Sequence, residues 1–117
     1  DAFSGEIDAG TGFALVASAN TCFVWQHAQA VRGVPTCYIF SCPPSYLSGG
    51  QQEPPFHKLV PYGSNRKREP GLVLLSVSGQ VRFWDGIGIG LAGGEHYTSS
   101  ELKLADEELV TGLIRCD

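Results

Sequence analysis

Two segments of the chain share one pattern: GLVLLSVSGQVRFW at residues 71–84 and GFALVASANTCFVW at residues 12–25. They align without a gap, and three positions are identical: Gly12/Gly71, Leu15/Leu74 and Trp25/Trp84. In each segment an apolar run, a small polar turn and a second apolar run ending in tryptophan follow one another. Asn20 aligns with Gly79 at the turn, and both residue types tolerate the positive φ that a tight hairpin needs. The pattern predicts a repeated β-hairpin.

The composition is that of one globular unit. The chain has 117 residues, 43% of them hydrophobic, and a formal net charge of −4. This apolar content excludes a disordered chain. The negative net charge gives no sign of the strongly basic surface that nucleic-acid binding needs. No apolar run is long enough to span a bilayer, and residues 1–12 lack a secretory signal pattern. We expect both ends to be cuts within a longer protein.

The cysteines are Cys22, Cys37, Cys42 and Cys116. Cys22 lies in an apolar strand pattern, where a free cysteine acts as a small hydrophobe. We expect reduced thiols and an intracellular setting, because a chain this apolar needs no disulfides to hold a core. Cys37, Cys42 and His27 fit no zinc-ligand spacing, so no metal site is predicted.

Strand-like apolar runs cover the chain at residues 13–17, 22–25, 34–40, 56–60, 72–75 and 81–84. Residues 13–17 and 72–75 are apolar without alternation, which is typical of strands covered on both faces. Residues 43–55 hold four of the seven prolines and predict an exposed loop. Residues 1–11 predict a loop or a short strand with Ile7 as its aliphatic anchor.

We predict an all-β fold of about two β-propeller blades, each an antiparallel four-stranded sheet, within a longer ring. The blade-like repeats are about 12–60 and 71–105, and 109–117 begins a further blade, all within one domain spanning 1–117. The alternative is a small β-sandwich in which the two hairpins match by chance.

At the second hairpin the sequence resembles a known family. The passage from Glu69 to Gly88, EPGLVLLSVSGQVRFWDGIG, is similar to the "EPGL…GKVRYW(E/D)xI" passage in the amino-terminal propeller of the nucleoporin 133/155 family. The 133 branch fits better because of the Val81–Trp84 ending and the context of Ile87. The glycine-rich continuation at residues 86–90 departs from the family's serine-rich one, which makes this loop the least secure part of the match.

The resemblance implies a non-enzymatic structural scaffold component of the nuclear pore complex, in the Y-shaped complex of its outer rings. Such a module contributes to nucleocytoplasmic transport and mRNA export. Its implied partners are other nucleoporins and, in some family members, curved nuclear membrane. The resemblance implies a location at the nuclear envelope. It implies no direct nucleic-acid partner, no small-molecule substrate and no cofactor.

The glycine-rich loop at residues 86–94 has two interpretations besides a plain solvated loop. As a membrane- or partner-contact loop it would present four apolar residues: Ile87, Ile89, Leu91 and Tyr97. The alternative is a ligand-binding or enzymatic β-domain, because residues 88–93 match Gly-x-Gly-x-x-Gly, although the polar stretch that follows is poor helix material for a dinucleotide site. His27, His57 and His96 are far apart, and no catalytic residue is predicted; His57 is interpreted as a surface strand residue.

Overall fold

The strands of the protein belong to two separate stretches of chain. The computed structural model describes residues 3–27, 36–44, 52–61, 69–88 and 98–101. Within these ranges there are eight strands and no α-helix. The strands are β1 Ser4–Asp8, β2 Phe13–Ala17, β3 Thr21–Gln26, β4 Cys37–Ser41, β5 Phe56–Val60, β6 Gly71–Leu75, β7 Gln80–Trp84 and β8 Thr98–Glu101.

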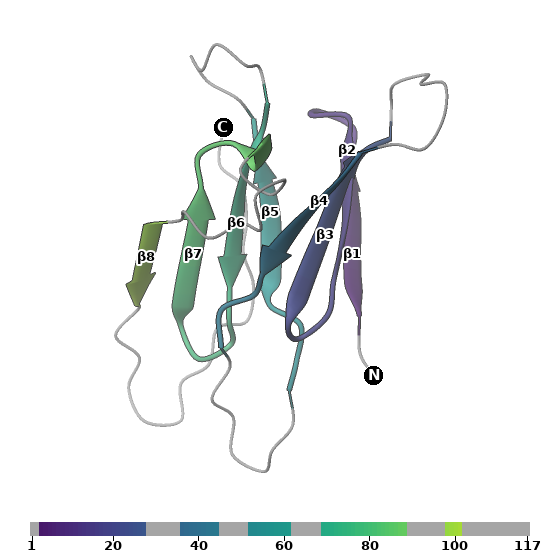
Figure 1. Ribbon diagram of the computed structural model, residues 1–117. Helices are drawn as coiled ribbons and strands as arrows, with labels where there is room; N and C mark the ends of the chain where they lie inside the picture. The colour runs from purple at the N-terminus through teal and green to yellow at the C-terminus, as the bar shows by residue number, and fades with distance from the viewer. Residues whose placement is uncertain (1–2, 28–35, 45–51, 62–68, 89–97, 102–117) are drawn as a thin grey trace.

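Each group of four consecutive strands forms one antiparallel sheet. The orders are β1-β2-β3-β4 and β5-β6-β7-β8, so that every strand pairs with its neighbour in the chain (Figure 1). The prediction of an all-β chain built from antiparallel sheets is confirmed. Residues 56–60, at the end of the first predicted repeat, pair with β6 in the second sheet, and residues 4–8 form the first strand of the first sheet. The division into blade-like repeats stays a prediction. Residues 102–105 and 109–117 lie outside the described residues.

Both predicted hairpins form, but their turns differ by one residue. In the first, the amide of Ser18 donates to the carbonyl of Thr21 and closes a two-residue loop. In the second, the amide of Ser76 donates to the carbonyl of Gln80 and closes a three-residue loop that ends at Gly79. Gly79 has φ of 95°, the left-handed conformation that a three-residue hairpin loop requires at this position.

The extra residue shifts the alignment by one position in the first strand of each hairpin. Leu15 and Leu74 are identical in the ungapped alignment, but they do not occupy equivalent positions relative to the tryptophan of their hairpin. Trp84 stands opposite Leu72, whereas Trp25 stands opposite Ala14. Because a shift of one residue moves a side chain to the other face of a sheet, Ala14 is the counterpart of Leu72. Among the three identities, only that of the tryptophans survives in the structure.

The core lies between the two sheets. The first sheet contributes alternate residues of β2 and β3 and the aromatic ring of Phe40, and the second contributes Leu59, Leu72, Leu74 and Trp84. The rings of Phe40 and Trp84 meet edge to face with centroids 4.8 Å apart. An aromatic pair in this geometry contributes about 0.5–1.5 kcal/mol beyond its buried area. The faces that carry these residues are called the inner faces below.

One close approach fixes the start of β6. A Cβ atom at Gly71 would lie 2.8 Å from the carbonyl oxygen of Trp84 on the neighbouring strand. Only glycine fits there without a backbone shift, which gives Gly71 a steric role. Gly12 has a different one: it takes φ of 79° in the turn that joins β1 to β2. The two glycines that open the aligned segments are therefore not structural equivalents.

The two tryptophans should differ sharply in their effect on stability. Trp84 is 1% exposed and packs on Phe40, whereas Trp25 is only half-buried on the opposite side of its sheet. We expect Trp84→Ala to lower the free energy of unfolding by about 3–5 kcal/mol because it opens a cavity in the core. Trp25→Ala should cost about 1 kcal/mol or less. Urea unfolding followed by circular dichroism measures both, and equal losses would contradict the assignment of the two faces.

Candidate functional site: an open apolar face on the first sheet

The outer face of the first sheet, which points away from the second sheet, is apolar along most of its width. Cross-strand neighbours share a face, so the strand register defines its two rows of side chains. One row runs Ile7, Ala14, Trp25 and Cys37, and the other Gly5, Val16, Phe23 and Ile39. We call these eight residues the open face.

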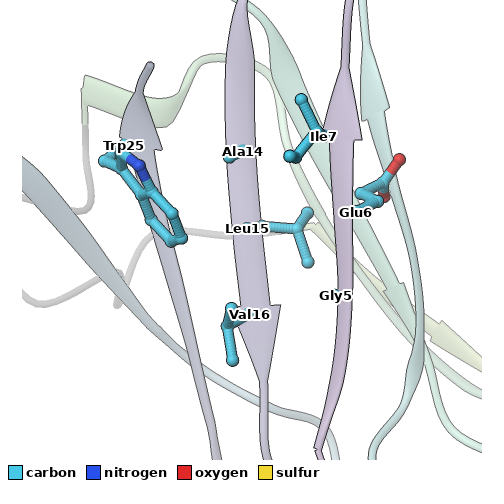
Figure 2. A pocket seen from close by; sticks show the side chains of 7 residues that line it. All are labelled: Gly5, Glu6, Ile7, Ala14, Leu15, Val16 and Trp25. Atoms are coloured by element: carbon cyan, nitrogen blue, oxygen red, sulfur yellow. The ribbon is translucent and has the colours of Figure 1, made fainter.

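Large side chains of the open face are accessible to solvent. Ile7 is 71% exposed, Ile39 45% and Phe23 39%. Figure 2 shows Trp25 on β3 and Ile7 on β1 standing on either side of β2, with Ala14 between them. The space above them is an open groove of about 480 Å³, lined by Gly5, Glu6, Ile7, Ala14, Leu15, Val16 and Trp25. A contiguous apolar patch of this kind marks an interaction surface in a soluble protein.

The sequence of β2 explains why both faces of this sheet are apolar. Residues 13–17 predict a strand covered on both sides, and the second sheet covers the side that carries Leu15. The other side of β2, which carries Val16, is less covered by the described residues. Phe23, which lies opposite Val16 on β3, remains exposed. The prediction for β2 is therefore met on one face and unmet on the other.

A polar cluster joins the first strands of the two sheets. The imidazole of His57 on β5 lies between two side chains of β1: its Nε2 is 2.7 Å from the Ser4 hydroxyl and its Nδ1 is 2.8 Å from a Glu6 carboxylate oxygen. A carboxylate only accepts, so Nδ1 donates to Glu6, and in the neutral ring Nε2 accepts from Ser4. The Lys58 ammonium lies 4.0 Å from the other Glu6 oxygen.

The distances at His57 match those of a serine–histidine–carboxylate relay, which raises the question of nucleophilic catalysis. Such a relay also needs a substrate carbonyl beside the hydroxyl and hydrogen-bond donors for an oxyanion. Here the His57 side chain is only 9% exposed between the sheets, and Ser4 begins a regular antiparallel strand. We therefore interpret the cluster as a structural clamp between β1 and β5. His57 is not the surface residue that the sequence predicted.

A second polar clamp joins the sheets at the end of β4. The Arg82 guanidinium on β7 donates to the backbone carbonyls of Ser41 and Cys42, at 3.1 and 3.2 Å. Hydrogen bonds from a charged donor are stronger than neutral ones, and these satisfy two carbonyls where β4 ends. The two clamps flank the apolar core, and neither lies on the open face.

Burial controls the chemistry of the described cysteines, all three of which are free thiols. Cys22 and Cys42 are buried, whereas Cys37 is exposed in the open face. Burial raises the pKa of Cys42 to about 12, although the nearby Arg82 charge acts in the opposite direction. Burial also raises the pKa of Cys22 far above its ordinary range. Neither buried thiol has the lowered pKa of a nucleophilic cysteine.

The start of the glycine-rich loop is part of the core and not a contact loop. Ile87 is fully buried, and its amide donates to the carbonyl of Pro70. The Ile87 side chain belongs to the core cluster and is therefore not presented at the surface as the predicted contact loop would require. The other three residues of that predicted site, Ile89, Leu91 and Tyr97, lie outside the described residues.

The same turn bears on the predicted ligand-binding alternative at residues 86–94. The Glu69 carboxylate accepts the Gly88 amide at 3.1 Å, and a Cβ at Gly86 or Gly88 would collide with that carboxylate. The Glu69 carboxylate of the chain itself thus accepts from the Gly88 amide, and Gly88 is the one residue of the Gly-x-Gly-x-x-Gly match that lies in the described residues.

Within the described residues, no three histidine, cysteine, aspartate or glutamate residues gather as a metal site would require. Nor do these residues contain a helix of the length and hydropathy needed to cross a membrane.

Sequence reasoning missed both the His57 clamp and the open face. Ser4 and Glu6 stand two residues apart and so share a face of β1, a signal that the sequence does contain. Their partner His57 is 53 residues from Ser4, and the pairing depends on how the two sheets stack. Comparison of the sequence with protein-family models and with curated proteins finds no match.

The His57–Glu6 contact should contribute measurably to stability. We expect a double-mutant cycle of His57→Ala and Glu6→Ala to give a coupling energy of about 1–2 kcal/mol, because one partner is charged and the contact is shielded between the sheets. Urea unfolding near neutral pH supplies the four free energies. Lys58→Ala is the matched control: its ammonium is half-exposed, so it should cost about 0.5 kcal/mol or less. A cost for His57→Ala no larger than that for Lys58→Ala would contradict the clamp.

The buried thiols should make the protein less stable in alkali. In the unfolded chain a cysteine has a pKa of about 8.5. Folded Cys42 has a raised pKa of about 12 and therefore keeps its proton to higher pH. The folded state then binds more protons, so the free energy of unfolding falls as pH rises through this window, by up to about 1.4 kcal/mol per pH unit per thiol.

Urea unfolding between about pH 8 and about pH 10 should therefore show a steeper loss in the wild type than in Cys42→Ala. Groups other than Cys42 titrate in both proteins, and the comparison cancels them. Iodoacetamide labelling gives an independent reading: Cys37 should react in the folded protein, and Cys22 and Cys42 only after unfolding. Identical pH slopes, or labelling of Cys42 at the rate of Cys37, would contradict the assignment.

Proposed function

We propose that this chain is a non-enzymatic structural module, two blades of a β-propeller, that serves in the scaffold of the nuclear pore's outer ring. The observation that carries the first part is the relation between the two sheets. A propeller repeats its blades head to tail, so that the same face of every blade points toward the preceding blade. A sandwich built by chance pairing carries no such relation.

The cross-strand rows supply this relation. On the inner face of the second sheet, Leu59, Leu72 and Trp84 form a row across β5, β6 and β7. On the open face of the first sheet, Ile7, Ala14 and Trp25 form a row across β1, β2 and β3. Both rows read aliphatic, aliphatic, tryptophan in the same strand order. The face that the second sheet presents to the first corresponds to the face that the first sheet leaves open, as a head-to-tail repeat requires.

The residues of the family-like passage each have a part in this architecture. Glu69 holds the turn after β7, Gly71 gives room to the Trp84 carbonyl, and Gly79 shapes the hairpin loop. Trp84 and Ile87 fill the core. The passage that carries the resemblance thus includes positions that shape the second sheet, and this supports the proposal of a nuclear-pore propeller. Propeller blades in that scaffold would bind other nucleoporins and would need no cofactor.

A cellular experiment tests the nuclear-pore role. The chain carrying a fluorescent tag should collect at the nuclear rim, and proximity labelling from it should enrich nucleoporins of the outer ring. Trp84→Ala should lose both signals because it destabilises the core, whereas Asn20→Lys, in the exposed first turn, should keep them. A diffuse distribution of the wild type without enrichment of nucleoporins would overturn this role and leave the blade architecture unaffected.

A further inference from the structure

The open face has a counterpart within the chain itself. In the interface that the structure contains, the row Leu59, Leu72 and Trp84 of the second sheet packs on the inner face of the first sheet. The equivalent row of the open face, Ile7, Ala14 and Trp25, has no sheet on it among the described residues. It therefore needs a partner that resembles the inner face of the first sheet.

The outer face of the second sheet supplies that resemblance. Its central row runs Lys58, Val73 and Phe83, and the adjoining row runs Phe56, Leu75 and Val81. In the first sheet the corresponding inner rows are Glu6, Leu15 and Val24, and Ser4, Ala17 and Cys22. In both sheets, the residues that these two rows take from the second and third strands are apolar. The residue that the central row takes from the first strand is charged: Glu6 in the first sheet and Lys58 in the second. We refer to these six residues of the second sheet as the rear face; Leu75 is buried and the other five are half-buried.

We propose that the open face of one copy of this chain binds the rear face of a second copy, head to tail. The inference rests on the blade-like relation of the two sheets and is independent of the nuclear-pore role. The new interface continues the one already present within the chain, since each sheet meets the next in the same orientation. Because the two surfaces are unlike, the association is heterologous: it grows beyond dimers, into a ring if the rotation closes and into a filament if it does not.

Charge favours a protein partner over a lipid surface on the open face. The lining of the groove contains no described basic residue, and the chain carries a net charge of −4. Amphipathic surfaces that bind anionic membranes usually carry lysine and arginine beside their apolar residues. Lys58 of the rear face is half-exposed and lies 4.0 Å from the Glu6 carboxylate of its own chain, so apolar contact and not this charge would hold the second copy. Two sheets commonly pack face to face in proteins.

The test is sedimentation velocity of the purified chain across a wide range of concentrations, with one variant for each surface. Ile7→Glu puts a charge in the open face, and Phe83→Lys puts one in the rear face. Asn20→Lys, in an exposed turn outside both faces, is the control for added charge. Near-ultraviolet circular dichroism and urea midpoints verify that each variant folds, and Val81→Lys replaces Phe83→Lys if the latter does not.

The wild type and Asn20→Lys should form species larger than dimers as concentration rises. Ile7→Glu and Phe83→Lys should each remain monomeric alone, and their mixture should form a capped one-to-one dimer, because each variant retains the surface that the other lacks. This rescue distinguishes head-to-tail binding from the pairing of two open faces. A wild type that stays monomeric at every concentration, or a Phe83→Lys that associates as the wild type does, would overturn the proposal.

Discussion

The structure depends on the contact between the inner faces of the two sheets, with Trp84 of the second seated against Phe40 of the first. Neither four-stranded sheet has a helix beside it among the described residues, so each sheet relies on the other to cover an apolar face. An apolar sheet face that stays in water loses the free energy that its burial would contribute. The features that surround this contact serve to hold it: the three-residue turn that aligns β6 with β7, the glycine that allows Trp84 to approach β6, and the turn that brings Ile87 into the core.

Polar groups refine this contact without driving it. The His57 and Arg82 clamps lie at the margins of the core, where their bonds satisfy side chains and carbonyls that would otherwise lose hydrogen bonds on burial. They also restrict how the sheets slide over one another, because each links a named strand of one sheet to a named strand of the other. Apolar packing alone is tolerant of such shifts, and directional bonds at two margins make one alignment preferable.

Much of the fold could be predicted from the pattern of one hairpin, but the faces of its strands could not. The apolar runs identify β2, β3, β6 and β7, and turn residues identify the loops between them. The ungapped alignment nevertheless placed Leu15 on Leu74, since nothing in the sequence announces that the turn at Gly79 is one residue longer. The glycines around Ile87 indicate a loop residue, although its side chain is fully buried in the core. The His57 clamp depends on sheet stacking, which a single sequence does not contain. The nuclear-pore resemblance stays a prediction.

The open face is what the proposed head-to-tail relation of the two sheets requires. If two sheets pack through equivalent faces, both outward faces can be polar, and the unit closes upon itself. In a head-to-tail relation, the face that docks on the preceding sheet and the face that receives the next are different, and both must be apolar in every sheet. The two described sheets make one such junction. The continuous apolar run of β2, with Leu15 covered and Phe23 exposed opposite Val16, matches that requirement. A surface that would be an aggregation hazard on an isolated domain would be, in the proposed architecture, the second half of a repeated joint.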